Sequence, residues 1–470
     1  MLREHLKIQL TSYLEYEPTQ GQQDLFDRIT VFISRPAQPE ILLVRGYSGT
    51  GKTTSVRALV RLLDNMGHSS VLLAPTGRAA KVLSEYTGKE AYTIHKKIYR
   101  QKSSKDGFGK FVLNYNRAYE TIFVVDEASM ISNCSSESSL FGSGALLNDL
   151  IDFVFGGKRC KLILIGDTAQ LPPVGTSLSE ALDKEKLEHF GYPVTEVLLD
   201  EVVRQAKDSG IHTNATVIRR QIANLDIKIP RFKVEYFKDI CRISGREVIE
   251  LLEDYYQGGN PDDTIIIVRS NKMANKYNEG IRRQIMYKEE QITAGDMVMV
   301  VKNNYYWLPE IEEADFIANG DILHIDRIHG YEERYGYHFA DVTVSFTTRE
   351  MPPLDVKVLL DTLWIDSPSL TSEQNKELFY RILENYPAEK NKKKAFDQVR
   401  NDPFFNALQI KFAYAITCHK AQGGQWKTVF LDQGFIPKEQ ITIEYLRWLY
   451  TAVTRATDKL YLVNFPDYYF

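Results

Sequence analysis

What the sequence lacks narrows the classes of protein it can encode. Its four cysteines have neither the paired spacing of a zinc site nor that of a disulfide framework. No apolar run approaches the roughly 20 residues that a helix needs to cross a bilayer. The first residues interleave charge with leucine, unlike a secretory signal. These absences argue against a disulfide-stapled secreted domain and against a membrane protein, and we expect a cytoplasmic location.

The chain also lacks an excess of positive charge. It has 58 lysines and arginines against 62 aspartates and glutamates, which gives a net charge of -4. A nucleic-acid partner therefore cannot be argued from overall basicity, and any such partner needs a local groove. The composition, 43% hydrophobic and 26% charged over 470 residues, suits a globular protein of about two to four domains.

Short apolar segments alternate with amphipathic segments from Ile41 onward, the pattern of a doubly wound parallel sheet. The strands expected in a first domain are residues 41–44, 71–74, 122–125, 162–165 and 197–199. Further strand signals at 264–268, 428–431 and 460–463 predict a second domain. The expected fold class is therefore α/β.

An interruption of different character separates the strand signals of the second domain. Strand patterns at 297–301, 321–328 and 338–346, with a turn signal at Asn319-Gly320, predict a small inserted β-barrel. A capping box at Thr371–Gln374 then predicts a helical extension. The predicted division is 1–200 for the first domain, 201–294 with 401–470 for the second, and 295–400 for the insertion.

Residues 46–53, Gly-Tyr-Ser-Gly-Thr-Gly-Lys-Thr, match the P-loop pattern in full, between an apolar strand and a helix. Backbone N–H groups of such a loop close around phosphates at the positive end of a helix. Lys52 is predicted to hold the β- and γ-phosphates, and Thr53 to ligate Mg²⁺. The predicted nucleotide-binding residues are Gly46, Ser48, Gly49, Thr50, Gly51, Lys52, Thr53 and Thr54.

Polar residues with catalytic chemistry follow two further strands. Asp126 and Glu127 end the strand at 122–125, where Asp126 is expected to hold Mg²⁺ and Glu127 to deprotonate the attacking water. Gln170 follows the next strand and is a candidate sensor of the γ-phosphate, although an ordinary turn gives the same pattern. Arg204 and Arg455 are candidate arginine fingers, with surface ion pairs as the alternative.

Taken in order, these motifs resemble those of superfamily 1 helicases, and of their RecD-like branch in particular. The segments that carry the resemblance are the P-loop, 74–80, 93–95, Asp126-Glu127, 166–175, Arg204, 414–423 and 450–455. The resemblance extends from about residue 19 to residue 455. It implies two RecA-like domains, an inserted hairpin (1B) at about 97–118, an SH3-like barrel (2B), and ATP with Mg²⁺ as cofactors.

The resemblance also implies roles for individual residues. Gln22 corresponds to a glutamine that reads adenine, and Gly423 to a nucleotide-binding position. Residues that correspond to the family's single-strand track are Thr76, Arg78, Thr93, His95, Asn271, Lys272, Thr417, His419 and Lys420. Their hydroxyl, amide and cationic groups suit phosphate contacts that position a strand without reading its sequence. Gln425 departs from the family, in which glutamate is more usual.

Residues 99–115 carry a hairpin signal with Asp106-Gly107 and Gly109 at its centre. Members of the RecD-like branch carry a protruding pin at this place, and Phe108 is the candidate side chain for stacking on the last base pair. The alternative is a polar surface loop.

The expected function is an ATP-dependent DNA helicase that moves 5′-to-3′. The direction is implied by the resemblance, including Leu171 in place of the aromatic residue found in oppositely directed relatives. The expected partners are single-stranded and tailed duplex DNA, without a membrane, and other replication, repair or recombination proteins, with a monomer as the working unit. An ATP-gated nucleic-acid clamp and an RNA helicase remain alternatives.

Overall fold

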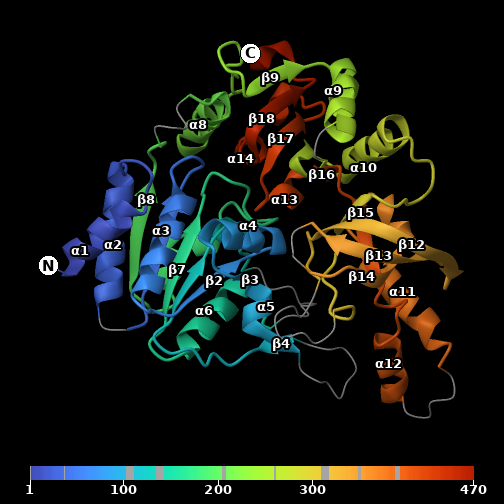
Figure 1. Cartoon of the computed structure of the whole chain (residues 1–470), viewed down its shortest axis with the longest axis horizontal. Helices are drawn as coiled ribbons and strands as arrows, with labels where there is room; N and C mark the ends of the chain where they lie inside the picture. Colours follow the sequence, from blue (N-terminus) through green and yellow to red (C-terminus); the bar gives the residue numbers. More distant parts are fainter. Residues whose placement is uncertain are drawn as a thin grey trace.

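The computed structural model describes residues 2–35, 38–101, 111–133, 142–203, 208–258, 261–308, 317–347, 351–386 and 392–470. Two parallel sheets, each flanked by helices, account for most of the chain, and a closed barrel lies beside them (Figure 1). The first sheet belongs to the blue and green part of the chain, whereas the second combines green and red segments that are far apart in the sequence. The α/β class expected from the sequence is confirmed.

The first sheet has the strand order β3-β2-β6-β7-β1-β8, and every neighbouring pair is parallel. Its strands are β1 (Ile41–Gly46), β2 (Ser70–Ala74), β3 (Ala91–Thr93), β6 (Ile122–Val125), β7 (Lys161–Gly166) and β8 (Val194–Leu199). Its helices are α1 (Leu2–Ser12), α2 (Gln20–Ser34), α3 (Lys52–Asn65), α4 (Gly77–Thr87), α5 (Ile94–Ile98), α6 (Leu146–Gly156) and α7 (Lys184–Glu188). Both faces of the sheet are buried, which explains the nearly continuous apolar strands.

The second sheet has the order β16-β10-β17-β18-β9 and is also parallel. Its strands are β9 (Ile240–Ile243), β10 (Thr264–Val268), β16 (Ala415–Thr417), β17 (Trp426–Asp432) and β18 (Ala456–Val463). Its helices are α8 (Gly210–Ala223), α9 (Gly245–Gly258), α10 (Asn271–Gly280), α13 (Cys418–Ala421) and α14 (Ile443–Val453). The short strands β3, β9 and β16 were not predicted, because three or four residues carry little periodicity.

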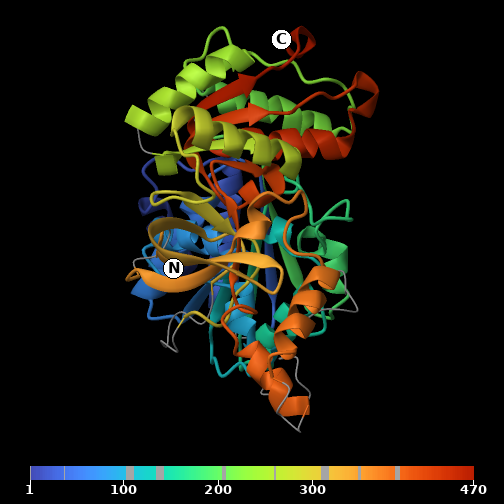
Figure 2. The same cartoon turned by 90° about the vertical axis from the view of Figure 1, so that its right-hand side faces the viewer.

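The insertion contains a closed five-stranded barrel. Its strands are β11 (Met297–Val300), β12 (Ile322–Arg334), β13 (Tyr337–Phe346), β14 (Leu354–Leu359) and β15 (Leu408–Phe412). The helical extension follows as α11 (Ser372–Leu383), with the expected capping box at Thr371, and α12 (Lys392–Arg400). Both helices project away from the barrel (Figure 2). The last barrel strand, β15, lies beyond residue 400 and pairs with β14. Helices α11 and α12 separate these two strands in the sequence, so local sequence patterns do not reveal the pairing.

A small two-stranded sheet interrupts the first domain between α5 and β6. β4 (Tyr99–Gln101) and β5 (Phe111–Leu113) pair in antiparallel fashion. The aromatic ring of Phe111 lies 4.5 Å, centroid to centroid, from that of Tyr305 in the insertion. Residues 102–110, which include Phe108, are outside the described part of the chain. Within the described ranges, none of the helices has the length and apolar character that crossing a membrane requires.

Candidate nucleotide site and nucleic-acid track

The P-loop connects β1 to α3. Gly49 and Gly51 adopt φ values of +75° and +79°, a left-handed conformation that glycine accepts without strain. The Lys52 ammonium group donates to the carbonyl oxygens of Gly46 and Tyr47, each at 2.8 Å, and lies 3.9 Å from Asp167. The lysine is therefore folded back over the loop, where it can meet a phosphate group.

The strand order brings the two carboxylates predicted to be catalytic, Asp126 and Glu127, near this loop, because β7 is the neighbour of β1 and β6 is the neighbour of β7. Burial and the neighbouring Glu127 raise the pKa of Asp126 to about 6. A carboxylate whose ionised form is costly gains from a divalent cation. Asp126 and the Thr53 hydroxyl are hard oxygen ligands of the kind that Mg²⁺ prefers, so the residues present fit this cofactor.

Gln170 and Asp167 lie in the loop after β7. Gln170 is 4% exposed, and its Oε1 has no hydrogen-bond partner within the described ranges. Asp167 is fully buried, and its carboxylate accepts the Ala169 N–H at 2.9 Å. Because a buried polar atom without a partner is costly, the Gln170 side chain suits a role in holding a water molecule or a ligand.

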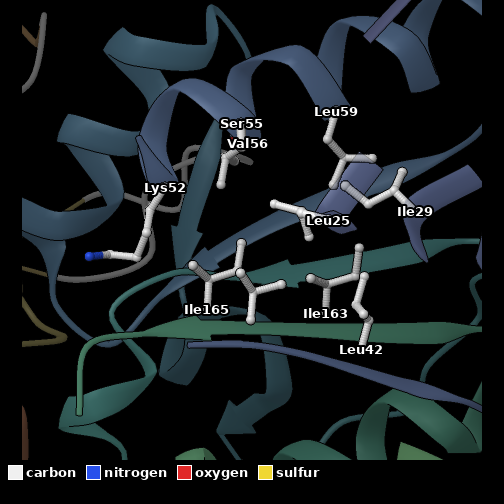
Figure 3. Close-up of a pocket in the computed structure, with 10 residues that line it drawn as sticks. Leu25, Ile29, Leu42, Lys52, Ser55, Val56, Leu59, Ile163 and Ile165 are labelled. Carbon is white, nitrogen blue, oxygen red and sulfur yellow. The ribbon is translucent and has the colours of Figure 1, made fainter. Parts of the chain in front are cut away.

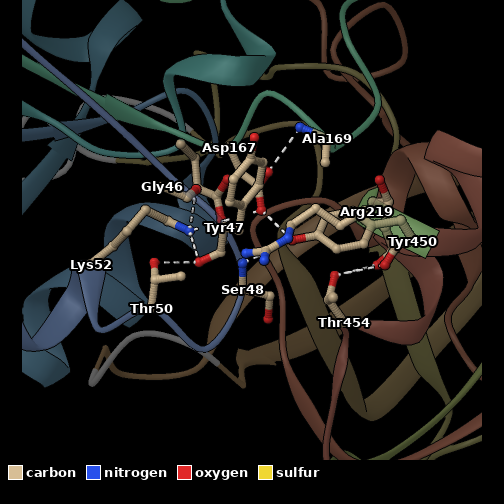
Figure 4. Close-up of polar contacts among 12 residues, drawn as sticks. Gly46, Tyr47, Ser48, Thr50, Lys52, Asp167, Ala169, Arg219, Tyr450 and Thr454 are labelled. Carbon is tan, nitrogen blue, oxygen red and sulfur yellow. Dashed lines mark hydrogen bonds and ion pairs between the residues drawn. The ribbon is translucent and has the colours of Figure 1, made fainter. Parts of the chain in front are cut away.

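Helix α14 of the second domain binds this same loop. The Tyr450 hydroxyl donates to Asp167 Oδ2 at 2.7 Å and accepts the Ser48 N–H of the P-loop at 2.8 Å (Figure 4). Arg447 donates to the carbonyl oxygen of Thr168 at 2.9 Å. One helix of the second domain thus contacts the P-loop and the 167–171 loop together.

Two further contacts extend this junction. The Thr451 hydroxyl accepts the Leu171 N–H at 2.9 Å, and Gln422 donates to the Leu171 carbonyl at 2.7 Å. No role was predicted for Tyr450, Arg447 or Thr451. Tyr450 and Thr451 lie within the motif at 450–455, but nothing in the local sequence distinguishes Arg447 from a surface arginine.

The candidate arginine fingers have different positions. Arg455 is 3% exposed, and its guanidinium donates to the carbonyls of Thr451 and Gly424, each at 3.1 Å, and to Thr454 Oγ1 at 3.3 Å. All three acceptors belong to the second domain, so these bonds do not carry Arg455 to the P-loop. Arg204 is outside the described residues. The preceding residue, Val203, donates its N–H to the Gly49 carbonyl at 2.9 Å.

Gln22 lies against the P-loop from α2. It is fully buried, and its side chain forms a capping box with Thr19 and donates to the Tyr16 hydroxyl at 3.1 Å. A Cβ atom added to Gly51 would lie 2.4 Å from Gln22 Nε2. The structure therefore brings Gln22 to the loop. Its amide oxygen already accepts the Thr19 N–H at the start of α2.

An apolar pocket lies beneath the P-loop helix (Figure 3). Its lining residues are Leu25, Ile29, Leu42, Val44, Lys52, Ser55, Val56, Leu59, Ile163 and Ile165. The Lys52 side chain points away from the apolar residues. Because most of its lining cannot hydrogen-bond phosphate, this space belongs to the core between α2, α3 and the sheet.

The predicted single-strand track begins where strands end and helices begin. Thr76 and Thr93 are the N-caps of α4 and α5, after β2 and β3, and Thr417 precedes α13, after β16. A Cβ atom on Gly423 would lie 3.2 Å from Thr76 Oγ1, so the two domains meet at this point. The Arg78 guanidinium stacks 3.8 Å from the centroid of the Trp426 ring, across the same junction.

Of the other predicted track residues, Lys272 is exposed, whereas His95 and Lys420 are partly withdrawn from water. Burial lowers the pKa of His95 to about 4, and burial with the charge of Lys411 lowers that of Lys420 to about 8. Burial also lowers the pKa of His419. The two histidines are therefore mainly neutral near pH 7, whereas the Lys420 ammonium group is still charged and gains from a phosphate partner. Asn271, the residue before Lys272, instead donates to the Asp366 carbonyl at 2.9 Å.

Comparison with known proteins agrees with this geometry. The family model described as "AAA domain" matches residues 19–229, and that described as "UvrD-like helicase C-terminal domain" matches residues 412–463. The first match covers the first sheet domain and helix α8 of the second domain, and the second match covers the last strands of the second domain. The fold and the site define a P-loop protein of two RecA-like domains.

Individual proteins of known name or structure are also similar to this chain. The chain is 24% identical to the ATP-dependent RecD2 DNA helicase of Deinococcus radiodurans, over 94% of this chain and 50% of that protein. It is 26% identical to the ATP-dependent DNA helicase dda of phage T4, over 60% of each chain. A solved Bacteroides Pif1 helicase, in complex with ADP-AlF3 and single-stranded DNA, aligns over 97% of this chain and 96% of that one, with a TM-score of 0.46 and 15% identity.

The chain thus spans about half the length of RecD2 and 60% of that of dda. The two family models, in their order along the chain, and these two relatives all match this chain. The chain is therefore similar to superfamily 1 helicases.

Proposed function

We propose that this protein is an ATP-dependent DNA helicase that moves 5′-to-3′ along a single strand and unwinds duplex DNA. The observation that carries the proposal is the position of Tyr450. This residue belongs to the second domain, and its hydroxyl bonds both the P-loop and Asp167 of the first domain. A nucleotide bound at the P-loop would change the contacts that hold the two domains together. Hydrolysis can then be coupled to domain movement, which a motor requires.

The residues of the first domain have distinct roles in hydrolysis. Lys52 neutralises the charge of the phosphates, and Glu127 accepts the proton of the attacking water. Thr53 and Asp126 would hold Mg²⁺, which supplies charge neutralisation between the phosphate oxygens when it is bound. Gln170 orients the water through its buried amide, and Gln22 lies where it can read the base.

The DNA strand is proposed to cross the helix starts of both domains. Thr76, Arg78, Thr93 and His95 would meet it on the first domain. Asn271, Lys272, Thr417, His419 and Lys420 would meet it on the second domain. Phosphate contacts from such groups hold any sequence. Phe108, between β4 and β5, is proposed as the residue that stacks on the base pair to be split.

Unwinding of tailed duplexes tests the function and its direction. We expect ATP-dependent strand displacement from a duplex with a 5′ single-stranded tail, and little from one with a 3′ tail. The measurement is fluorescence of a labelled strand, with DNA-stimulated ATPase followed in parallel. ATPase without displacement from either tail would indicate the ATP-gated clamp, and preference for an RNA strand would indicate an RNA helicase.

The arginine substitutions Arg455→Ala and Arg204→Ala test whether the second domain completes the site. Fingers supplied across an interface can contribute on the order of a thousandfold in rate. We expect turnover to fall much more than ATP affinity, because the arginines act on charge that develops during hydrolysis. Since Arg455 bonds within its own domain here, its contribution requires a shift of its side chain. Unchanged DNA-stimulated turnover in both variants would remove them from the mechanism.

A further inference from the structure

Helix α8 of the second domain faces the P-loop at two points. His212 and Arg219 are seven residues apart and therefore lie on one face of the helix. The Arg219 guanidinium carbon is 4.3 Å from the centroid of the ring of Tyr47, a P-loop residue. Figure 4 shows the side chains of Arg219 and Tyr47 next to each other. A Cβ atom on Gly49 would lie 3.0 Å from His212 Nδ1. The same helix face thus meets the second and the fourth residue of the loop.

The ring nitrogen of His212 that faces the loop is polar, buried and unused. Within the described ranges, Nδ1 has no hydrogen-bond partner. The backbone of the residue, in contrast, is satisfied, because its N–H donates to Ser209 Oγ at 3.2 Å and its carbonyl accepts from Thr216 Oγ1 at 2.8 Å. A buried nitrogen without a partner costs about as much as a lost hydrogen bond. Its position suits a ligand that enters the P-loop.

Asp239 holds this end of α8 in place. Its carboxylate accepts the Gly210 N–H at 2.9 Å and the Ile211 N–H at 3.2 Å. Burial lowers the pKa of His212, whereas the charge of Asp239 acts in the opposite direction. Either the protonated ring or the neutral tautomer with its proton on Nδ1 can donate from this atom. The helix start is therefore fixed, and the nitrogen can serve as a donor.

We propose that His212 donates from Nδ1 to the phosphate chain of the nucleotide bound at the P-loop. The ligand class is a nucleoside diphosphate or triphosphate, whose phosphates the backbone N–H groups of such a loop surround. The second domain then contacts the nucleotide itself through α8, in addition to its contact with the loop through Tyr450. The inference rests on the proposed ATP-dependent function.

Calorimetric titration of the full chain with Mg-ADP tests this contact. His212→Ala should weaken ADP binding about tenfold, the fold-change expected when a hydrogen bond to a charged group is lost. In steady-state ATPase assays, KM for ATP should rise by a similar factor while kcat changes less. His212→Asn, which retains a polar group near the Nδ1 position, should restore most of the affinity.

Two variants separate a polar contact from simple packing. His212→Leu has a similar volume without the donor and should bind ADP as weakly as His212→Ala, at an unchanged melting temperature. His189→Ala, at an exposed histidine that bonds its own helix, should bind like the unsubstituted protein. Affinity in His212→Leu equal to that of the unsubstituted protein would overturn the contact. Absence of ADP binding to the unsubstituted protein would overturn the proposed function, and this contact with it.

Discussion

Replacing Lys52 by alanine should reduce ATP hydrolysis by a factor on the order of a thousand, as expected for the loss of a preorganised charged donor in an enclosed site. Lys52 is the only cationic side chain in the loop sequence 46–53. Its ammonium group already lies over the loop, 2.8 Å from two carbonyl oxygens. Without it, the γ-phosphate loses the cation that this loop provides. Single-turnover hydrolysis of labelled ATP, with and without single-stranded DNA, measures the effect.

The control for this substitution is Arg61→Ala. Arg61 is an exposed cationic residue of the same helix, α3, so its removal should leave hydrolysis nearly unchanged. Both variants should melt within a few degrees of the unsubstituted protein, because neither change opens a large core cavity. Near-normal turnover in Lys52→Ala would refute the assignment of residues 46–53 as the nucleotide loop.

The positions of the first domain's candidate site residues in the fold could be predicted from the sequence, because each motif is a continuous segment. The P-loop is a continuous segment with a defined spacing, and Asp126-Glu127 directly follows a run of four buried residues. Parallel strands align their carboxyl ends at one edge of the sheet, so the fold class itself predicts that the P-loop and Asp126-Glu127 lie near each other. The structure confirms that β1, β7 and β6 are neighbours.

The junction between the domains could not be predicted in the same way. The contacts of Arg447, Tyr450 and Thr451 join residues about 280 positions apart, and single residues carry no periodic signal. The same reason applies to His212, which reads as an ordinary residue of an amphipathic helix. Closure of the barrel through β15 likewise depends on a long-range pairing.

Arg455 shows that a sequence motif predicts the region of a residue but not the direction of its side chain. Its motif predicted an arginine near the nucleotide, and the residue does follow α14, the helix that contacts the P-loop. Its guanidinium is nevertheless held by Gly424 and Thr451. A motif specifies which residue type is available in a region, whereas the direction of the side chain depends on which acceptors packing brings within reach.

Substitution of Glu127 by glutamine should separate nucleotide binding from hydrolysis. The amide has nearly the same shape as the carboxylate but cannot accept a proton from the attacking water, so the chemical step should slow by about 100- to 10,000-fold. Glu127 lies next to Asp126 and raises its pKa. Removing that charge should therefore leave Mg-ATP affinity equal to or somewhat tighter than before.

The variant should consequently accumulate as a complex with Mg-ATP and single-stranded DNA. Equilibrium titrations with ATP and with a labelled oligonucleotide measure the two affinities, and rapid quench gives the hydrolysis rate. Glu185→Gln, an exposed glutamate in α7 of the same domain, is the matched control and should retain full turnover. If Glu127→Gln lost affinity and turnover to the same extent, Glu127 would be a structural residue of the site, and proton acceptance would have to be assigned to another group.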